Sequence, residues 1–304
     1  MPGFVVSGGG DVDMIKASTK LRQLVAREDI LVLPGVYDAL TAKIAADAGF
    51  EALVMGGYSI AATRLGQPDV GYLGMTEMAQ AVKTIAGAVD LPLFADGDTG
   101  YGNALSVRRT VKEYEQAGAA AIIFEDQVWP KRCGHMQGKA VIPAEEHVQK
   151  IKAAVDARSD NDVMIVARTD ARAVLGLEEA IERGHKYLAA GADALFIEAP
   201  QNEDEMRRIG CEFPQAVLLA NMIEGGKTPV LPAEKLQQMG FKIVFWPCTL
   251  LYTVLHNVSQ VLKTLRETGS TEQCSKQMAD FMAFNEFIGL KKYNEIEKQY
   301  QVKS

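Results

Sequence analysis

The sequence has few cysteines, and none of them belongs to a recognisable pair. No Cys-x-x-Cys motif and no His/Cys spacing of zinc ligands is present, which excludes a zinc finger. Scattered free thiols are typical of a reducing compartment rather than of a disulfide scaffold. We therefore expect a cytoplasmic protein. The four cysteines are Cys133, Cys211, Cys248 and Cys274.

Long runs of apolar residues and long runs of basic residues are also absent. No apolar stretch approaches the roughly 20 residues of a membrane helix, and no long basic run accompanies the net charge of -7. We therefore expect neither a membrane span nor a nucleic-acid surface. No GxGxxG motif follows the first apolar run, which argues against a nicotinamide enzyme. Segment 1–13 is rich in glycine without a basic n-region, so we expect a disordered tail rather than a signal peptide.

What the sequence does contain is one pattern repeated eight times. After a leading helix at 17–28, each unit has a short apolar run, a polar or glycine-containing loop and an amphipathic helix. The apolar runs are 30–33, 52–55, 93–95, 121–125, 163–167, 194–197, 217–220 and 243–246. The helices expected after them are 40–48, 75–88, 104–117, 144–157, 177–190, 204–213, 233–239 and 249–268, with a long loop before the second.

These eight units predict a single (β/α)8 barrel of the TIM type. Runs that stay apolar without alternation are typical of parallel strands covered on both faces, and eight strand–helix units close a barrel. The composition, 48% hydrophobic and 23% charged over 304 residues, is that of an ordinary globular protein. No composition break divides the units, so we expect one domain over 14–304.

A helical extension is expected beyond the barrel, at about 270–300. Its apolar stripe includes Phe281, Met282, Phe284 and Phe287. Such a stripe packs either on its own barrel or on a neighbouring subunit.

Acidic residues follow most of the predicted strands. Active residues of such barrels gather at the carboxyl ends of the strands, so we expect these side chains at one mouth. Packed carboxylates repel one another unless a cation lies among them, and oxygen ligands suit Mg2+ or Mn2+. We expect Asp96 as the direct ligand, with Asp98 and Glu125 acting directly or through water. The full set is Gly57, Tyr58, Asp96, Asp98, Glu125, Asp126, Arg168, Asp170, Glu198, Asn221 and Glu224.

The segment 124–139, FEDQVWPKRCGHMQGK, predicts a lid with a catalytic cysteine. Cations flank Cys133 in the sequence, and positive charge favours a thiolate, so a low thiol pKa is expected. Glycines on both sides of His135 predict a loop that moves. The alternative is a solvated basic loop with an incidental cysteine.

Together these residues describe a pocket for an anionic, oxygen-rich substrate. The planar guanidinium of Arg168 could form two parallel hydrogen bonds to a substrate carboxylate. The backbone N–H groups of Gly57 and Tyr58 would hold another carboxylate, and Asn221 would bind a more distant one. In a bound 2-hydroxy acid, loss of the hydroxyl proton would break the C2–C3 bond, with metal and Arg168 stabilising the charge. Cys133 would then protonate the released fragment.

The motifs resemble the isocitrate lyase/phosphoenolpyruvate mutase superfamily, and the KRCGH segment resembles its lyase branch. This resemblance implies Mg2+ near Asp69, Asp96, Asp98 and Glu125. It implies that Cys133 is the proton donor and that Lys131 and His135 tune its acidity. It also implies substrate contacts from Arg168, Glu198 and Asn221, and a homotetramer whose subunits exchange terminal helices. The motifs are LGQPDVG (65–71), ADGDTGYGN (95–103), EDQ (125–127), PKRCGHMQGK (130–139), ARTDA (167–171) and LANMIEGGKTP (219–229).

The function expected from this resemblance is a Mg2+-dependent carbon–carbon lyase. It would cleave an acid such as 2,3-dimethylmalate or 2-methylisocitrate to pyruvate and a carboxylate. Met136 after the lid histidine and the EGGKTP loop favour a smaller acid than a tricarboxylate, and Tyr58 is the candidate general base. The alternatives are an oxaloacetate hydrolase or decarboxylase, against which Pro247 argues, and a barrel that binds a metabolite without catalysis.

Overall fold

A computed structural model describes residues 15–301 of the chain. The tail expected at 1–13 lies outside the described residues. The chain divides into two compact units, one ending at Thr249 and one beginning at Leu250, and each is described by itself.

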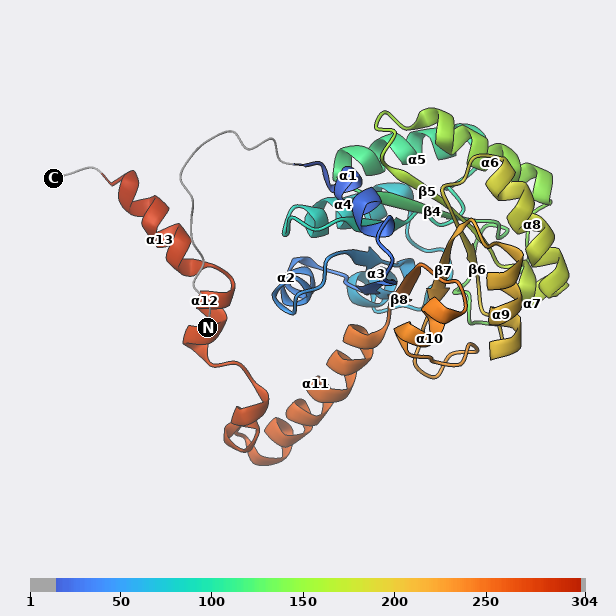
Figure 1. Ribbon diagram of the computed structural model, residues 1–304. Coiled ribbons are helices and arrows are strands. Elements are labelled where there is room, and N and C mark those ends of the chain that lie inside the picture. Colours follow the sequence, from blue (N-terminus) through green and yellow to red (C-terminus); the bar gives the residue numbers. More distant parts are fainter. Residues whose placement is uncertain (1–14, 302–304) are drawn as a thin grey trace. The chain divides into compact units, whose positions relative to one another are not determined.

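The first unit is a barrel of eight parallel strands. Their order is β1-β8-β7-β6-β5-β4-β3-β2, and a parallel bridge between Gly35 and Val54 joins β1 to β2, so the sheet closes on itself. Figure 1 shows helices surrounding these strands. The predicted (β/α)8 fold is therefore confirmed. The strands are β1 Leu31–Pro34, β2 Leu53–Met55, β3 Leu93–Asp96, β4 Ala121–Glu125, β5 Met164–Thr169, β6 Ala194–Ile197, β7 Val217–Asn221 and β8 Ile243–Trp246.

Ten helices accompany the strands within the described part of this unit. Two of them were not expected, namely α3, which fills the segment predicted as a long loop, and the short α7. The loop prediction was wrong because Gly56 caps a helix that starts at Gly57 and buries Ile60 and Ala61. The helices are α1 Ala17–Val25, α2 Ala39–Asp47, α3 Gly57–Leu65, α4 Met75–Ala86, α5 Ala104–Ala117, α6 Ala144–Ala157, α7 Ala171–Leu175, α8 Leu177–Ala189, α9 Glu203–Glu212 and α10 Ala233–Gln238.

The inside of the barrel is filled by side chains. Phe245 makes edge-on contacts with Phe94, at 5.4 Å between ring centroids, and with Phe196, at 6.2 Å. Leu21 and Leu24 of α1 belong to the same buried cluster as these strand residues. Because the interior is packed, a binding site has room only where the strands end.

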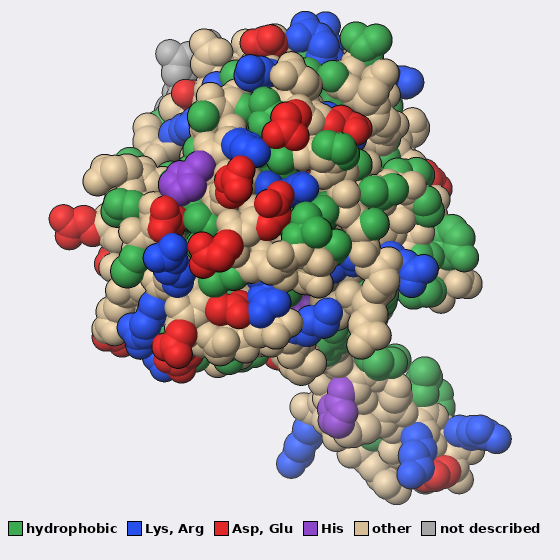
Figure 2. Space-filling view, turned by 90° about the vertical axis from the view of Figure 1, so that its right-hand side faces the viewer, with side chains coloured by type: hydrophobic (Ala, Val, Ile, Leu, Met, Phe, Trp, Pro, Cys, Tyr) green, Lys and Arg blue, Asp and Glu red, His purple; other side chains and the backbone are tan. Residues whose placement is uncertain are grey.

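Charged side chains of both signs are interspersed on the face shown in Figure 2. Ion pairs link neighbouring helices, such as Lys186 of α8 with Glu145 of α6 at 3.2 Å. Exposed pairs of this kind contribute little to stability. This face therefore presents no patch of a single charge sign.

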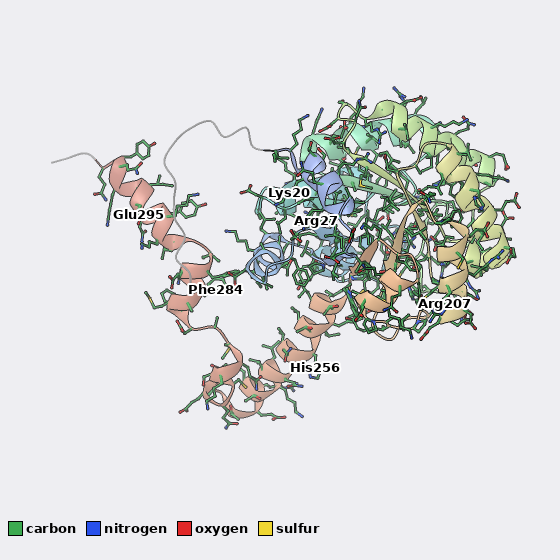
Figure 3. The ribbon with its side chains drawn as sticks, viewed as in Figure 1. Lys20, Arg27, Arg207, His256, Phe284 and Glu295 are labelled. Carbon is green, nitrogen blue, oxygen red and sulfur yellow. The ribbon has the colours of Figure 1, made fainter. Side chains whose placement is uncertain are left out.

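The second unit contains α11 Thr249–Thr268, the 3-10 helix η1 Glu272–Gln277, α12 Phe281–Phe287 and α13 Leu290–Gln299. The predicted apolar stripe is present on α12, where the side chains of Phe281 and Met282 are 80% and 73% exposed. Figure 3 shows Phe284 standing out from α12. Among residues 15–301, no helix combines the length and the apolar character needed to cross a bilayer.

Candidate active site

One cavity lies where the barrel strands end, and it is lined by most of the predicted site residues. The lining comes from the ends of β2, β3, β5, β6, β7 and β8, from the lid and from the loop after α3. Asp98 and Glu125 do not line the cavity but contact residues that do. The lining includes Gly57, Tyr58, Asp69, Asp96, Lys131, Cys133, Gly134, His135, Arg168, Glu198 and Asn221, together with Ile223, Pro247 and Cys248.

The lid is a loop whose base is closed by backbone hydrogen bonds. The N–H of Val128 donates to the carbonyl of Ala140 at 2.8 Å, and the N–H of Ile142 donates to Asp126 at 2.9 Å. Inside the loop, the Gln127 side chain accepts from the N–H of Arg132 at 3.0 Å and donates to its carbonyl at 2.8 Å. The residue before Cys133 is therefore held by a buried amide.

Three lid side chains tie the loop to carboxylates at the mouth. The ammonium of Lys131 lies 2.8 Å from Asp69 and 2.7 Å from Asp98. The ammonium of Lys139 lies 2.6 Å from Asp170 and also donates to the carbonyl of Gly134. These groups are almost fully buried, so the attraction between them is screened much less than that of surface pairs. The lid is closed over the cavity in this structure.

His135 forms the third tie, and the contacts of its two ring nitrogens define its tautomer. Its Nδ1 accepts from the backbone N–H of Lys227 at 2.9 Å, and its Nε2 lies 2.8 Å from Glu198 Oε1. The ring proton of a neutral His135 therefore belongs on Nε2, facing Glu198. This ring joins the lid to the loop after β7 and to the end of β6.

Gly134 allows the closest approach between the lid and the strand ends. A Cβ atom at this position would lie 2.5 Å from Arg168 Nη2 and 2.5 Å from Glu198 Cγ. No real Cβ tolerates such distances, and both neighbours are held by ion pairs. Closure of the lid therefore requires glycine here.

We expect Gly134→Ala to lower kcat/KM by about 10²-fold, because the added methyl group holds the lid, and Cys133 with it, away from the site. Steady-state kinetics with the best substrate measures the effect, and the melting temperature should change little. The matched control is Gly74→Ala, whose Cβ would meet nothing nearer than a Glu77 oxygen at 3.7 Å. Equal kinetics for the two variants would contradict the proposed close approach.

The expectation of a low thiol pKa for Cys133 was wrong. The pKa of Cys133 is raised to about 11, mainly by burial. The charges of Asp69 and Glu198 add to this effect, and the backbone N–H of His135 and the charge of Arg168 oppose it. The cations that flank Cys133 in the sequence do not help, because Lys131 is paired with Asp69 and Asp98. Cys133 is therefore a thiol at neutral pH, which is the form that donates a proton.

Arg168 is the central cation of the strand ends. Its guanidinium lies 3.2 Å from Glu125, 3.0 Å from Asp170 and 3.7 Å from Glu198, and it stacks 5.2 Å above the ring centre of Phe196. Burial opposes ionisation of Glu198, but Arg168 and the hydrogen bond from His135 outweigh it and lower the pKa of Glu198 to about 2. Glu125 behaves differently, because burial raises its pKa well above the usual range despite Arg168.

The four acids predicted to surround a metal are close to the cavity but do not form a complete cage. Among the described residues, no group of three His, Cys, Asp or Glu side chains is arranged to hold a metal ion. Asp96 accepts from the N–H groups of Gly57 at 2.9 Å and of Asp98 at 3.0 Å. Glu125 Oε1 is buried, and no hydrogen-bond partner for it is found within residues 15–301. This donor set fits Mg2+, which is commonly held by one or two carboxylates, waters and substrate.

Two of the predicted substrate contacts are engaged differently from the expectation. The N–H of Gly57 donates to Asp96 Oδ2, so it serves that carboxylate rather than a substrate carboxylate. The amide nitrogen of Asn221 lies 3.4 Å and 3.5 Å from the two oxygens of Glu198, while its Oδ1 is buried without a hydrogen-bond partner. Tyr58 lines the cavity as expected.

Asp126, expected at the mouth beside Glu125, is instead a structural residue behind it. Its carboxylate accepts from Thr169 at 2.7 Å, Tyr187 at 2.8 Å and Arg183 at 2.9 Å, and all of these bonds are buried. Adjacent residues of a strand point to opposite faces, so Glu125 and Asp126 cannot both face the cavity. Glu224, also expected at the mouth, does not line the cavity and accepts a hydrogen bond from Thr249.

Asp170 was expected at the mouth without a specific role, and Lys139 and Lys227 were not expected to contribute, but all three help to build the site. Asp170 holds both Arg168 and the lid residue Lys139. Its spacing of two residues from Arg168 at a strand end was a usable signal, because such residues lie on the same side. Lys227 contacts the lid through its backbone N–H, which donates to His135, and through its ammonium, which donates to the carbonyl of Met136 at 3.4 Å. Both partners are far from Lys227 in sequence, so no local pattern reveals them.

The comparisons with known proteins agree with this geometry. The family model described as phosphoenolpyruvate phosphomutase matches residues 21–266. The chain is 46% identical over 286 residues to 2,3-dimethylmalate lyase of Eubacterium barkeri, covering 94% of this chain and 99% of that protein. The chain belongs to the PEP mutase/isocitrate lyase superfamily. This confirms the resemblance drawn from its motifs.

Other members of the superfamily differ in reaction. The chain is 46% identical over 289 residues to the chloroplastic carboxyvinyl-carboxyphosphonate phosphorylmutase of Arabidopsis thaliana, covering 94% of this chain and 85% of that protein. A structure of oxaloacetate acetylhydrolase with 3,3-difluorooxalacetate superposes with a TM-score of 0.89 at 34% identity, covering 95% and 98% of the two chains. Phosphonopyruvate hydrolase with oxalate and Mg2+ superposes with a TM-score of 0.85 at 29% identity, covering 94% and 99%. Membership of the superfamily is therefore compatible with a lyase, a mutase or a hydrolase.

Proposed function

We propose that this protein is a Mg2+-dependent carbon–carbon lyase that cleaves a 2-hydroxy dicarboxylate or tricarboxylate, such as 2,3-dimethylmalate or 2-methylisocitrate. The observation that carries the proposal is the protonated thiol of Cys133 on a closed lid, facing the same cavity as Arg168 and Asp96. A phosphoryl transfer between an oxygen and a carbon of the substrate needs no proton donor at carbon, whereas cleavage of a C–C bond leaves a fragment that must be protonated there. The similarity to 2,3-dimethylmalate lyase over nearly its whole length supports the same reaction class.

The chain's own residues would bind the substrate and move its protons. Arg168 would hold the carboxylate next to the hydroxyl carbon, and Asn221 and Glu198 would orient the far part. Tyr58 is the candidate base that removes the hydroxyl proton, after which the C2–C3 electron pair moves onto C3. Cys133 would donate its proton to C3 and leave a thiolate near Arg168. The products are a 2-oxo acid, pyruvate for 2,3-dimethylmalate, and a carboxylate.

A metal ion fits the same arrangement. Asp96 would hold Mg2+, with Asp98, Glu125 and Asp69 acting directly or through water. When bound, the metal would polarise the hydroxyl and the adjacent carboxylate. Lys131 lies among these acids and would balance their remaining negative charge.

A substrate panel tests the proposal. Purified protein with Mg2+ should release pyruvate from 2,3-dimethylmalate or 2-methylisocitrate, detected with lactate dehydrogenase and NADH. Oxalate or carbon dioxide released from oxaloacetate, with no pyruvate from the hydroxy acids, would instead identify a hydrolase or decarboxylase. No turnover of any acid, with calorimetry showing no binding of Mg2+ or oxalate, would leave a barrel without catalysis.

We also propose that the protein is a homotetramer in which terminal helices pack on neighbouring subunits. The exposed apolar side chains of α12 and α13 support this proposal, because solvent-exposed stripes of this kind are unusual in a monomer. They include Phe281, Met282, Tyr293 and Tyr300, with exposures of 80%, 73%, 67% and 80%.

A further inference from the structure

A second cavity lies beside the lid and shares no lining residue with the candidate active site. It is enclosed by the loop after β3, by the first part of the lid and by α6. Its volume is about 210 Å³, more than ten times the space that one water needs. The residues that matter for its chemistry are Thr99, Tyr101, Gln127, Trp129, Glu146 and Lys150.

Lys150 brings a buried positive charge to this cavity. The residue is 5% exposed, and its ammonium donates one hydrogen bond, to the backbone carbonyl of Thr99 at 3.1 Å. Within residues 15–301 it forms no salt bridge. Burial also lowers the pKa of Lys150, which shows how poorly its charge is compensated. A buried ammonium without a counter-ion is unfavourable unless an anion reaches it.

Thr99 adds a hydrogen-bond donor at the same place. The residue is 1% exposed, and its hydroxyl has no hydrogen-bond partner in the part of the chain that the structure describes. A buried hydroxyl of this kind is unfavourable by itself. Both residues line the cavity, and we refer to the hydroxyl of Thr99 and the ammonium of Lys150 together as its polar wall.

The other charged groups near this wall do not neutralise Lys150. Glu146 lines the cavity and raises the pKa of Lys150, but it is exposed and forms no ion pair with it. Burial, with the charges of Lys150 and Arg183, lowers the pKa of His147 to about 3, so this neighbour is neutral. As far as the structure describes the chain, the buried side chains that line the cavity therefore include the ammonium of Lys150 and no carboxylate.

We propose that this cavity binds a small oxyanion, a carboxylate or a phosphate, through the ammonium of Lys150 and the hydroxyl of Thr99. Tyr101 and Trp129, whose rings meet edge to face at 5.9 Å, cover the same cavity with aromatic surface. The site does not depend on the reaction proposed above, because none of its residues lines the barrel mouth.

The bound anion stabilises the lid. Gln127 and Trp129 belong to the first part of the lid and form one side of the cavity. The amide of Gln127 holds both backbone groups of Arg132, which precedes Cys133. An anion that fills the cavity therefore orders the segment that positions the lid cysteine.

Calorimetric titration of the full-length protein with inorganic phosphate, and separately with acetate, tests the site. The wild type should bind at least one of these anions, and Lys150→Met should weaken that binding at least tenfold. Lys152→Met is the matched control, because Lys152 is exposed on the same helix and lines neither cavity. The anion that binds more tightly identifies the ligand as phosphate-like or carboxylate-like. Glu146→Gln should strengthen binding, because it removes a repelling charge.

A second variant separates loss of the site from loss of the fold. Thr99→Val removes only the hydroxyl and should also weaken anion binding, while Lys150→Met should not lower the melting temperature in anion-free buffer. Phosphate or acetate should raise the melting temperature of the wild type and slow alkylation of Cys133, and both effects should disappear in Lys150→Met. Binding that is unchanged in both variants, or a wild type that binds anions only at the barrel mouth, would overturn the proposal.

Discussion

Cys133→Ser is expected to lower kcat by about 10² to 10⁴-fold with little change in KM. The serine hydroxyl has nearly the same shape as the thiol but is a far weaker acid, so it protonates the carbon fragment released by C2–C3 cleavage much more slowly. Because burial raises the pKa of Cys133 to about 11, the thiol keeps its proton at neutral pH. The contribution of Cys133 to the rate should therefore be present below that pKa and be lost only as the pH rises through it.

Kinetics in deuterium oxide measure this role directly. Wild-type enzyme should place one solvent-derived deuterium on the carbon that was C3, and Cys133→Ser should form this product at the reduced rate. The control is Cys211→Ser, because Cys211 is exposed and does not line the cavity. A serine variant with wild-type kcat would remove Cys133 from the proposed mechanism.

Arg168→Met is expected to lower the free energy of unfolding by about 3 to 5 kcal/mol and to abolish turnover. Glu125, Asp170 and Glu198 all lie against this guanidinium, and all three are buried. Methionine fills the space of the side chain but leaves three carboxylates without their shared cation. Denaturant unfolding measures the loss of stability, and steady-state kinetics measures the loss of turnover.

Arg27→Met is the control for this experiment. Arg27 pairs with Glu51 at 2.8 Å, but both side chains are about half exposed, so the expected loss is about 0 to 1 kcal/mol. Adding Asp170→Asn to Arg168→Met should restore part of the stability, because one uncompensated charge is removed. An Arg168→Met protein as stable as the Arg27→Met protein would show that the carboxylates are neutral or hydrated instead.

Much of the barrel could be predicted because its signals are local. The strands β4, β6 and β8 and the helices α5 and α6 begin and end at the predicted residues. Buried parallel strands leave short apolar runs, and the following helices leave an amphipathic period, so each unit can be recognised without its neighbours.

The errors arose where distant residues decide the outcome. The pKa of Cys133 depends on burial and on Asp69 and Glu198, which are far from it in sequence, whereas the prediction used only adjacent cations. A long loop was expected before the helix at 75–88, but the segment forms α3, which buries Ile60 and Ala61. In both cases the tertiary environment outweighs a local preference.

The backbone bonds at the base of the lid limit how the protein can be damaged by oxidants. These bonds close the loop at Val128 and Ile142, so the lid would move as a flap hinged at these two residues. Its tip could then lift without disrupting the neighbouring strands. The sulfur of Cys133, which is partly exposed in this structure, would meet solvent peroxide most readily while the flap is raised. Enzyme kept in peroxide without a ligand should therefore lose activity faster than enzyme kept saturated with a slow substrate.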